Sequence, residues 1–552
     1  MSRVGSTRQK QRSVQKAIGV SLSAWVERRS LWIFLALTAV ASVRIVSTYS
    51  VFSHTFDEPA HLACGMEWLS EGAYRYEPQH PPLARLATAI GPYLAGLRTL
   101  HKSDMWDEGL ALLYDGGHYD RNLALARLGV LPFFWVAALV VYIWGKRYLG
   151  EPGAAFAVLL YTMLPPVLAH AGLATTDIAL TAMVSASLLT ALIWVEQPVP
   201  RNSIVFGAVT GLAVLSKFSA LPFLPSALGA ALLWHIASER PGFGKLVQAV
   251  RERIAQFCFA ILIAMLVVWA GYRFSFGPVP YASIRLPAPE LYPGIQQVID
   301  HNRQGDPSYL LGDHGRSGWW YYYFVVLAVK TPLPFIALFT YGVAQATRRE
   351  ARIALALSLG ILVFCLSSHI NLGVRHILPV YTGFAVVAAA GVARLRERSQ
   401  ERRSAGWVLA GLTIWMVATS VMSHPDYLPY FNALAGDSPE RILVDSDLDW
   451  GQDMKRLANR LREVGAPQVS FTPLVHADLD AQGFPPSQPN NPIRPSAGWN
   501  AISLTILKNA RFGLWGDHPE IHLWPDQIKP AERIGKGIWL WYFPPASPNS
   551  LH

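Results

Sequence analysis

The chain has 552 residues, of which 52% are hydrophobic and 15% charged, and its formal net charge is +10. An ordinary soluble protein is about 25% charged, so the apolar surplus predicts a membrane protein. The basic residues stand in short bursts between apolar runs, as topology signals do, which excludes a nucleic-acid partner; with only three cysteines, a disulfide framework and a cysteine-rich metal site are also excluded.

The first element is a basic segment, residues 1–30, followed by an apolar run at 31–51. Ala39-Val40-Ala41 resembles a signal-peptidase site. However, the leader is long and apolar sequence continues past Arg44, and both features favour an uncleaved signal-anchor. Either outcome places the segment after Ser53 on the outer side of the membrane.

Apolar runs continue along most of the chain. A helix needs about 20 apolar residues to cross a bilayer. About eleven runs are predicted to span, at 31–51, 122–144, 153–173, 177–195, 203–216, 219–236, 256–273, 319–341, 353–368, 376–393 and 405–422. The expected fold is therefore a polytopic α-helical membrane protein.

Lys and Arg are concentrated in alternate connections, which predicts that these connections and the N-terminus are cytoplasmic. The basic connections are Lys146-Arg147, Arg201, Arg240 to Arg253, Arg348-Arg349 with Arg352, and Arg394 to Arg403. The outer connections are then residues 52–121, turns near Thr175 and Lys217, residues 274–318 and a turn at 368–375. We expect an integral protein of a bacterial inner or plasma membrane, with residues 31–422 as its transmembrane domain.

The first outer loop contains Asp57-Glu58 and then His80-Pro81-Pro82. Adjacent carboxylates just beyond a membrane helix are costly, so they usually have partners or a chemical role. The alternative is a helix N-cap before Pro59, and the residues alone do not separate the two interpretations. Residues 83–97 carry apolar side chains at helical spacing, which suits either an interfacial helix or a simple cap on the bundle.

Three more polar groups interrupt the apolar background at outer turns. They are Thr175-Thr176-Asp177, then Lys217, and then His369 with Arg375-His376. An ionisable group near membrane depth indicates function, although Lys217 and Arg375 could instead reach the lipid headgroups. Because the predicted topology places all three groups on the outer face of the membrane, they favour a common site.

The last 130 residues, 423–552, contain no spanning run and predict a small extracytoplasmic α+β domain. Arg441 to Asp445 resembles a strand, Leu448 to Val464 an amphipathic helix with Asp449 as its N-cap, and Gly537 to Phe543 a second strand. The spacing of Asp445, Asp447 and Asp449 suggests a calcium loop, but the EF-hand positions for Gly and Glu hold Trp450 and Arg456, so we reject it. A role in binding carbohydrate or the acceptor remains open beside a plain turn.

The polar groups of the outer face suit the cleavage of a sugar–phosphate bond. That reaction needs a cation beside the departing phosphate and a carboxylate to take the proton of the attacking hydroxyl. Lys217, Arg375 and His376 could supply the first, and Asp57 the second. A divalent metal held by carboxylates and a histidine, such as Asp57 or Glu58 with Asp177 and His369, is an open alternative.

These residues resemble those of the GT-C-type membrane glycosyltransferases, in the family that includes dolichyl-phosphate-mannose protein mannosyltransferases and the bacterial aminoarabinose transferase of lipid A. The resemblance covers most of residues 30–395. It rests on Asp57-Glu58, His80-Pro-Pro-Leu83, Thr176-Asp177, Gly211-Leu-Ala-Val-Leu-Ser-Lys217 and Gly373-Val-Arg-His-Ile-Leu-Pro379.

The resemblance implies a polyprenyl-phosphate sugar as donor, inversion at the anomeric carbon, and Asp57 as base with Glu58 beside it in the catalytic pair. It also implies a donor phosphate site lined by Asp177, Lys217, Arg375 and His376, with His80 nearby. The acceptor would be an extracytoplasmic protein, lipid or glycan. The tail segment Val444 to Asp453 departs from the protein mannosyltransferases and leaves the acceptor open.

Two other functions remain as alternatives. A transporter or flippase of lipid-linked glycans would also have many spans, but transporters tend to show paired repeats and broken helices, and the sequence indicates neither. A non-catalytic membrane subunit would not need the charged first outer loop.

Overall fold

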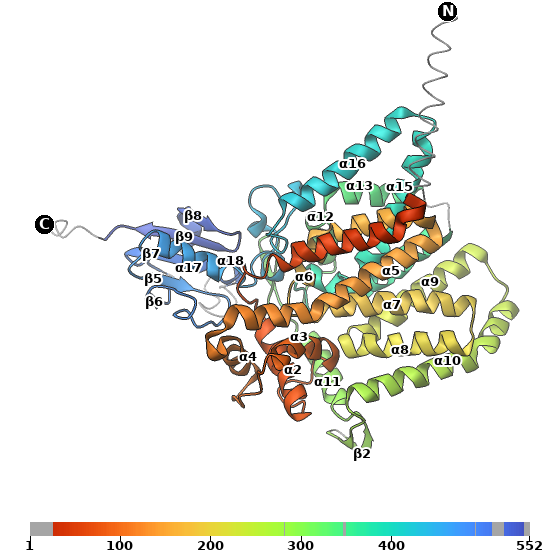
Figure 1. Cartoon of the computed structure of the whole chain (residues 1–552), viewed down its shortest axis with the longest axis horizontal. Helices are drawn as coiled ribbons and strands as arrows, with labels where there is room; N and C mark the ends of the chain where they lie inside the picture. The colour runs from red at the N-terminus through yellow and green to blue at the C-terminus, as the bar shows by residue number, and fades with distance from the viewer. Residues whose placement is uncertain (1–25, 281, 346–348, 492, 510–523, 546–552) are drawn as a thin grey trace, which may run out of the picture.

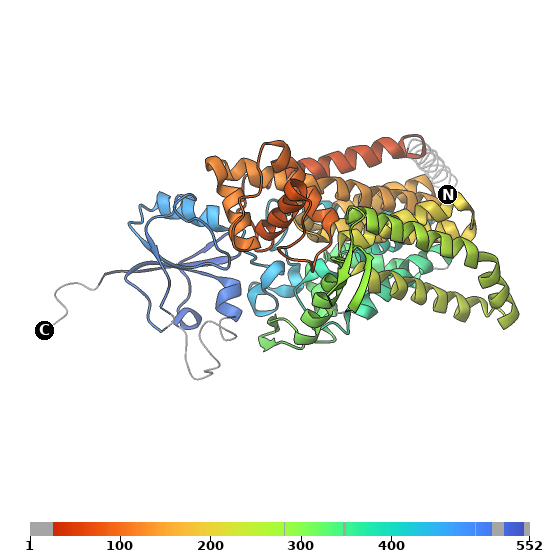
Figure 2. The same ribbon diagram turned by 90° about the horizontal axis from the view of Figure 1, so that it is seen from below.

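The computed structural model describes residues 26–280, 282–345, 349–491, 493–509 and 524–545. Most of the predicted basic leader, up to residue 25, lies outside the described residues. Long helices form a bundle, and a β-sheet lies at one end of it (Figure 1). Short helices lie beside the long helices toward the end that carries the sheet, and the second view shows the same arrangement (Figure 2).

Within the described residues, six helices are long and apolar enough to cross a membrane, or seven if one bent pair counts as a single span. The six are Val26–Val46, α5 (Tyr119–Thr162), α7 (Asp177–Glu196), α9 (Ala220–Glu239), α10 (Phe243–Gly271) and α16 (Arg403–Met422). The chain is therefore an integral multi-pass membrane protein, and the count of eleven spans stays a prediction.

Further helices belong to the bundle. Among them are α6 (Pro165–Ala171), α8 (Pro200–Ser216), α14 (Arg349–Cys365) and α15 (Val380–Ser399). Helix α8 packs on α10, α14 packs on α9, and α15 packs on α5. One large hydrophobic core runs through these helices, with Phe134, Tyr161 and Tyr381 fully buried in it.

The predicted span 319–341 is broken into α12 (Tyr322–Lys330) and α13 (Leu333–Ala344), which meet at 116°. Thr331 is extended and Pro332 starts the next helix, because proline has no N–H to continue a helix and disfavours helical geometry in the residue before it. The expectation of no broken helix was wrong at this point. The predicted span at 153–173 is likewise interrupted, since α5 ends at Thr162 and Pro165 begins α6.

Short elements of the two long connections predicted to be outer lie beside the bundle. In the first connection they are α2 (Glu58–Glu71), α3 (Pro82–Leu94), α4 (Met105–Tyr114) and η1 (Asp115–Gly117). In the second they are β1 (Phe276–Val279), β2 (Ala282–Pro287), α11 (Leu291–Gln304), β3 (Ser308–Leu310) and β4 (Asp313–Gly315). The predicted helix at 83–97 is α3, which leaves Ile90 and Leu94 exposed.

Beyond the last long helix, the chain forms a five-stranded sheet in the order β6-β5-β7-β9-β8. The strands are β5 (Val469–Thr472), β6 (Ser487–Gln488), β7 (Gly498–Ser503), β8 (Glu532–Ile534) and β9 (Ile538–Phe543), and the helices are α17 (Met454–Glu463), α18 (Leu504–Asn509) and α19 (Trp524–Gln527). Strand β5 is parallel to β6 and β7, whereas β9 is antiparallel to β7 and β8. The segment predicted as an amphipathic helix contains α17, and Leu457 and Leu461 lie on its buried face.

Two predictions for this part were wrong. Residues 441–445 are not a strand but lie between the turns η4 (Pro439–Arg441) and η5 (Asp445–Asp447). Asp449 is not an N-cap, because α17 begins only at Met454, and Asp449 instead accepts hydrogen bonds from Ser503 and from the N–H of Gly451. The strand predicted at 537–543 is found as β9.

Candidate active site

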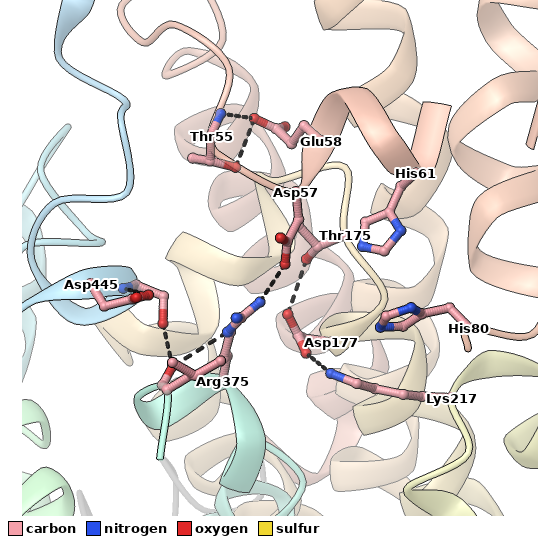
Figure 3. A network of polar contacts seen from close by, with 12 residues as sticks. Thr55, Asp57, Glu58, His61, His80, Thr175, Asp177, Lys217, Arg375 and Asp445 are labelled. Atoms are coloured by element: carbon pink, nitrogen blue, oxygen red, sulfur yellow. Dashed lines mark hydrogen bonds and ion pairs between the residues drawn. The ribbon is translucent and has the colours of Figure 1, made fainter. Parts of the chain in front are cut away.

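A cavity of about 460 Å³ lies where the first outer loop, the end of α8, the turn η2 (Val374–Ile377) and the C-terminal part meet. Its lining includes Asp57, His80, Lys217, Arg375, His376 and Asp445. Five of these six were predicted as site residues from the sequence. They come from segments far apart in the chain, and Figure 3 shows most of them pointing toward one another.

Asp57 forms an ion pair with Arg375 at the centre of this cavity. The distance from Arg375 Nη1 to Asp57 Oδ2 is 2.6 Å, and the Arg375 side chain is 9% exposed. Asp57 occupies the N-cap position of α2, but its side chain makes no capping hydrogen bond. The N-cap alternative therefore does not account for its carboxylate, which faces a buried cation instead.

Lys217 and Asp177 form a second ion pair. Lys217 is extended at the end of α8, and its Nζ lies 2.7 Å from Asp177 Oδ1. The other carboxylate oxygen of Asp177 accepts a hydrogen bond from Thr175 at 3.2 Å. Asp177 does not line the cavity itself but holds the lysine that does.

Glu58, the other predicted catalytic carboxylate, points away from the cavity. Its two oxygens accept hydrogen bonds from Arg127 Nε and Nη2, both at 2.8 Å, and both side chains are 1% exposed. The N–H groups of Thr55 and Ala174 also donate to Glu58. Burial would raise the pKa of Glu58, but Arg127 and these hydrogen bonds lower it. The arrangement fixes the first outer loop to the bundle.

Histidines form one wall of the cavity. His80 Nδ1 lies 3.1 Å from a carboxylate oxygen of Glu77, and burial lowers the pKa of His80 although Glu77 acts in the opposite direction. His61 packs edge-on against His80 with ring centres 5.2 Å apart. His61 was not selected as a site residue from the sequence, although its position one helical turn after Asp57 is a signal that could have found it.

The possible metal site is not supported. Asp57, Asp177 and His369 do not form a group that could hold a metal ion, and the described residues contain no such group of three or more ligating side chains. His369 does not line the cavity, and its N–H donates to Asn302. Asp57 and Asp177 are instead each neutralised by a basic side chain.

Comparison with protein-family models gives a match at residues 121–269 to a family described as dolichyl-phosphate-mannose-protein mannosyltransferase. This match confirms the resemblance over residues 121–269. The matched segment includes Asp177 and Lys217, whereas Asp57, Arg375 and the C-terminal part lie outside it. Comparison with curated proteins gives no match.

Several solved structures are similar. ArnT from Cupriavidus metallidurans bound to undecaprenyl phosphate is 15% identical, with a TM-score of 0.49 over 92% of this chain and 97% of that chain. The Pmt1-Pmt2 complex of S. cerevisiae bound to its sugar donor is 15% identical, with a TM-score of 0.34 over 44% and 33%. The oligosaccharyltransferase AglB from Archaeoglobus fulgidus, in complex with an inhibitory peptide and a dolichol-phosphate, is 12% identical, with a TM-score of 0.46 over 89% and 72%.

Trp450 and Asp445 are two of the cavity residues that follow the last predicted span, and neither was selected from the sequence. The ring of Trp450 is buried and lies under Arg375, with the guanidinium carbon 4.3 Å from the ring centre. Asp445 is half-buried, and its carboxylate faces the cavity. The acidic run from Asp445 to Asp453 was the available signal, and the sequence left a role in binding carbohydrate or the acceptor open beside a plain turn without assigning single residues to it.

Asp445 should make stability depend on pH. Burial raises its pKa to about 6, and Arg375 acts in the opposite direction. The Asp445 carboxyl therefore binds a proton more tightly in the folded protein than in the unfolded chain. Its protonated form stabilises the fold below about pH 4, and this contribution is lost as the pH rises through 6. When the pH is raised from 4.5 to 7.5, the thermal midpoint of the wild type should fall further than that of Asp445→Asn. Parallel pH profiles would contradict this assignment.

Proposed function

We propose that the chain is a glycosyltransferase that moves a sugar from a polyprenyl-phosphate donor to an extracytoplasmic acceptor, with inversion at the anomeric carbon. The observation that carries the proposal is the single cavity in which the Asp57 carboxylate meets two basic side chains, Arg375 and Lys217. The match to a mannosyltransferase family over residues 121–269 supports the same reaction class.

Arg375 and Lys217 suit the donor phosphate. Both are held in place, Arg375 by Asp57 and the ring of Trp450, and Lys217 by Asp177. As the bond between the anomeric carbon and the phosphate oxygen breaks, negative charge grows on that oxygen, and fixed cations in a cavity shielded from water stabilise it strongly. The electron pair of the broken bond stays on the phosphate.

Asp57 suits the proton transfer. A phosphate that binds Arg375 competes with Asp57 for the guanidinium and so releases the carboxylate beside the reacting centre. Asp57 then takes the proton of the acceptor as its oxygen forms the new bond to the anomeric carbon. The base therefore becomes available only when the donor phosphate is bound.

The topology is part of the proposal. The positive-inside pattern places the N-terminus in the cytoplasm and residues 52–121, 274–318 and 423–552 outside. In this arrangement the cavity opens between outer connections and the C-terminal domain. A reporter enzyme fused after Ser423 should be active only in its exported form, and activity of a cytoplasmic reporter at this position would overturn the topology.

The enzymatic proposal is tested with membranes from cells that express the chain and from matched cells that lack it. Both receive a polyprenyl-phosphate sugar that is radiolabelled in the sugar. We expect label in acceptor material only where the chain is present. Equal labelling of the two membranes would overturn the proposed function.

Lys217→Met should weaken binding of the carrier. The variant removes one of the two cations assigned to the phosphate, and a charged hydrogen bond to a buried anion typically contributes about 1.5–3 kcal/mol, so we expect the dissociation constant for polyprenyl phosphate to rise about tenfold or more. The measurement is a binding titration of the solubilised full chain. Lys217→Arg keeps the charge and should retain most of the affinity; unchanged binding by Lys217→Met would remove Lys217 from the phosphate site.

A further inference from the structure

The cavity has two chemically different ends. Figure 3 shows Lys217 and His80 on one side of the Asp57–Arg375 pair and Asp445 on the other. The first end belongs to the bundle and the first outer loop. The second end is formed by the chain after the last long helix, and within the described residues it contributes Asp445, Trp450, Leu474, Thr505, Ile506 and Asn509 to the lining. This set carries one charge, a carboxylate, and includes no basic side chain.

Asp445 is held in an unusual backbone conformation that directs it at the cavity. Its φ of 56° lies in the left-handed region, which aspartate tolerates better than most residues. The N–H of Asp445 donates to Thr505 Oγ1 at 2.8 Å, and its carbonyl accepts from the N–H groups of Leu448 and Asp449. Its carboxylate accepts from the N–H of Ser446. Strained residues that the surrounding structure holds in place are concentrated at functional sites.

The same segment is fixed to the first outer loop. The N–H of Phe56 donates to the carbonyl of Trp450 at 3.1 Å, and the N–H of Ser53 donates to that of Gln452 at 3.0 Å. Asp57 and Asp445 are therefore positioned by one connected piece of structure. The C-terminal part is a wall of the cavity and not a separate module beside it.

Asn509 adds a second hydrogen-bond acceptor at this end. Asn509 lines the cavity, and its Oδ1 is buried and has no hydrogen-bond partner among the residues that the structure describes. A buried oxygen without a partner is costly and indicates a missing donor. A carboxylate and an amide oxygen together suit the hydroxyl groups of a saccharide or an alcohol. They disfavour a phosphate, because like charges at short range repel.

We propose that this end of the cavity binds the acceptor through Asp445 and Asn509, and that the acceptor is a hydroxyl compound without a phosphate at the reacting position. The inference rests on the proposed function and specifies the class of acceptor. Transfer would create a glycosidic bond to a hydroxyl oxygen, with its proton going to Asp57. It would not create a glycosyl phosphate.

The first test is the acid stability of the product. Material labelled by membranes that contain the full chain is treated with mild acid, which cleaves a glycosyl phosphate and leaves an ordinary glycoside intact. We expect the label to stay attached. Release of the label as free sugar would overturn the acceptor class while leaving the transferase function in place; absence of labelled material altogether would instead count against the proposed function.

The second test separates the two ends by mutation. Asp445→Asn should lower transfer about tenfold or more, and Asn509→Ala about threefold or more, since each removes a hydrogen bond to the acceptor. Binding of polyprenyl phosphate alone should stay within about twofold of wild type in both variants. Asp480→Asn, at an exposed carboxylate outside the cavity, is the matched control and should leave both measurements unchanged.

Two results would overturn the assignment. One is transfer at the wild-type rate by Asp445→Asn and Asn509→Ala. The other is a parallel loss of transfer and of polyprenyl-phosphate binding, which would place these residues at the donor end or in the folding of the site. If Asp445→Asn fails to accumulate in the membrane, Asn509→Ala alone decides, because that substitution removes a side-chain oxygen that the described residues do not use.

Discussion

Asp57→Asn should abolish sugar transfer while leaving the protein folded and able to bind polyprenyl phosphate. The substitution keeps the size of the side chain but removes its capacity to take a proton, and a positioned general base typically contributes a factor of about 10²–10⁴ to the rate. The loss should appear in the rate of labelled-sugar transfer at saturating donor. Carrier binding should be kept or increased, because Arg375 no longer has a competing carboxylate partner.

Asp107→Asn is the matched control for this experiment. Asp107 lies in the same outer loop, but its side chain is exposed and does not line the cavity. The control should transfer sugar at the wild-type rate. Undiminished transfer by Asp57→Asn at normal expression would remove Asp57 as the base, and loss of carrier binding together with transfer would assign it a structural role.

Glu58→Gln should destabilise the protein strongly. Glu58 and Arg127 are both buried and joined by two hydrogen bonds, so removing one charge leaves the other uncompensated, at a cost of about 3–5 kcal/mol. We expect a clear drop in the thermal midpoint of the solubilised protein. Combining Glu58→Gln with Arg127→Met should recover part of the loss, because the double variant buries no unpaired charge.

The comparison for this effect is Glu397→Gln. Glu397 pairs with Arg394 at 2.7 Å, but its side chain is 49% exposed, and exposed pairs contribute at most about 1 kcal/mol. The midpoint should change little in this variant. A small effect of Glu58→Gln, similar to that of Glu397→Gln, would show that the buried pair is not what fixes the first outer loop.

Asp57 and Glu58 are adjacent in the chain, but only Asp57 reaches the cavity, and the sequence alone could not distinguish them. Asp57 and Glu58 looked alike because both are carboxylates just beyond the first span. They lie at the start of a helix, where successive side chains point in directions about 100° apart, so one faces Arg375 and the other faces Arg127. Only the direction of α2 relative to the bundle decides which carboxylate reaches the cavity.

The site residues in the polar turns could be predicted from the sequence. Lys217, Arg375 and His376 interrupt long apolar runs, and the alternation of basic connections assigned their turns to one face before any contact was known. The cavity brings these three side chains together. His369 shared the same turn as Arg375 but faces elsewhere, because a turn without regular structure gives no periodicity from which a side-chain direction follows.

Asp445 could not be predicted in the same way. Its position depends on a left-handed turn held by Thr505, which is 60 residues later in the chain, and on contacts with the first outer loop. Local propensity contains none of this information, and it produced a false strand at 441–445. The regular elements with clear periodicity were easier, as the buried face of α17 shows.

A doubly labelled donor shows directly whether the cavity breaks a sugar–phosphate bond. The purified full chain is placed in vesicles fused with membranes that hold the acceptor. The vesicles receive a polyprenyl-phosphate sugar with one label in the sugar and another in the phosphate. We predict that the sugar label leaves the lipid while the phosphate label stays with it, and that Asp57→Asn prevents this separation. Movement of both labels together across the bilayer would instead identify the chain as a transporter of lipid-linked sugars and exclude the proposed transfer.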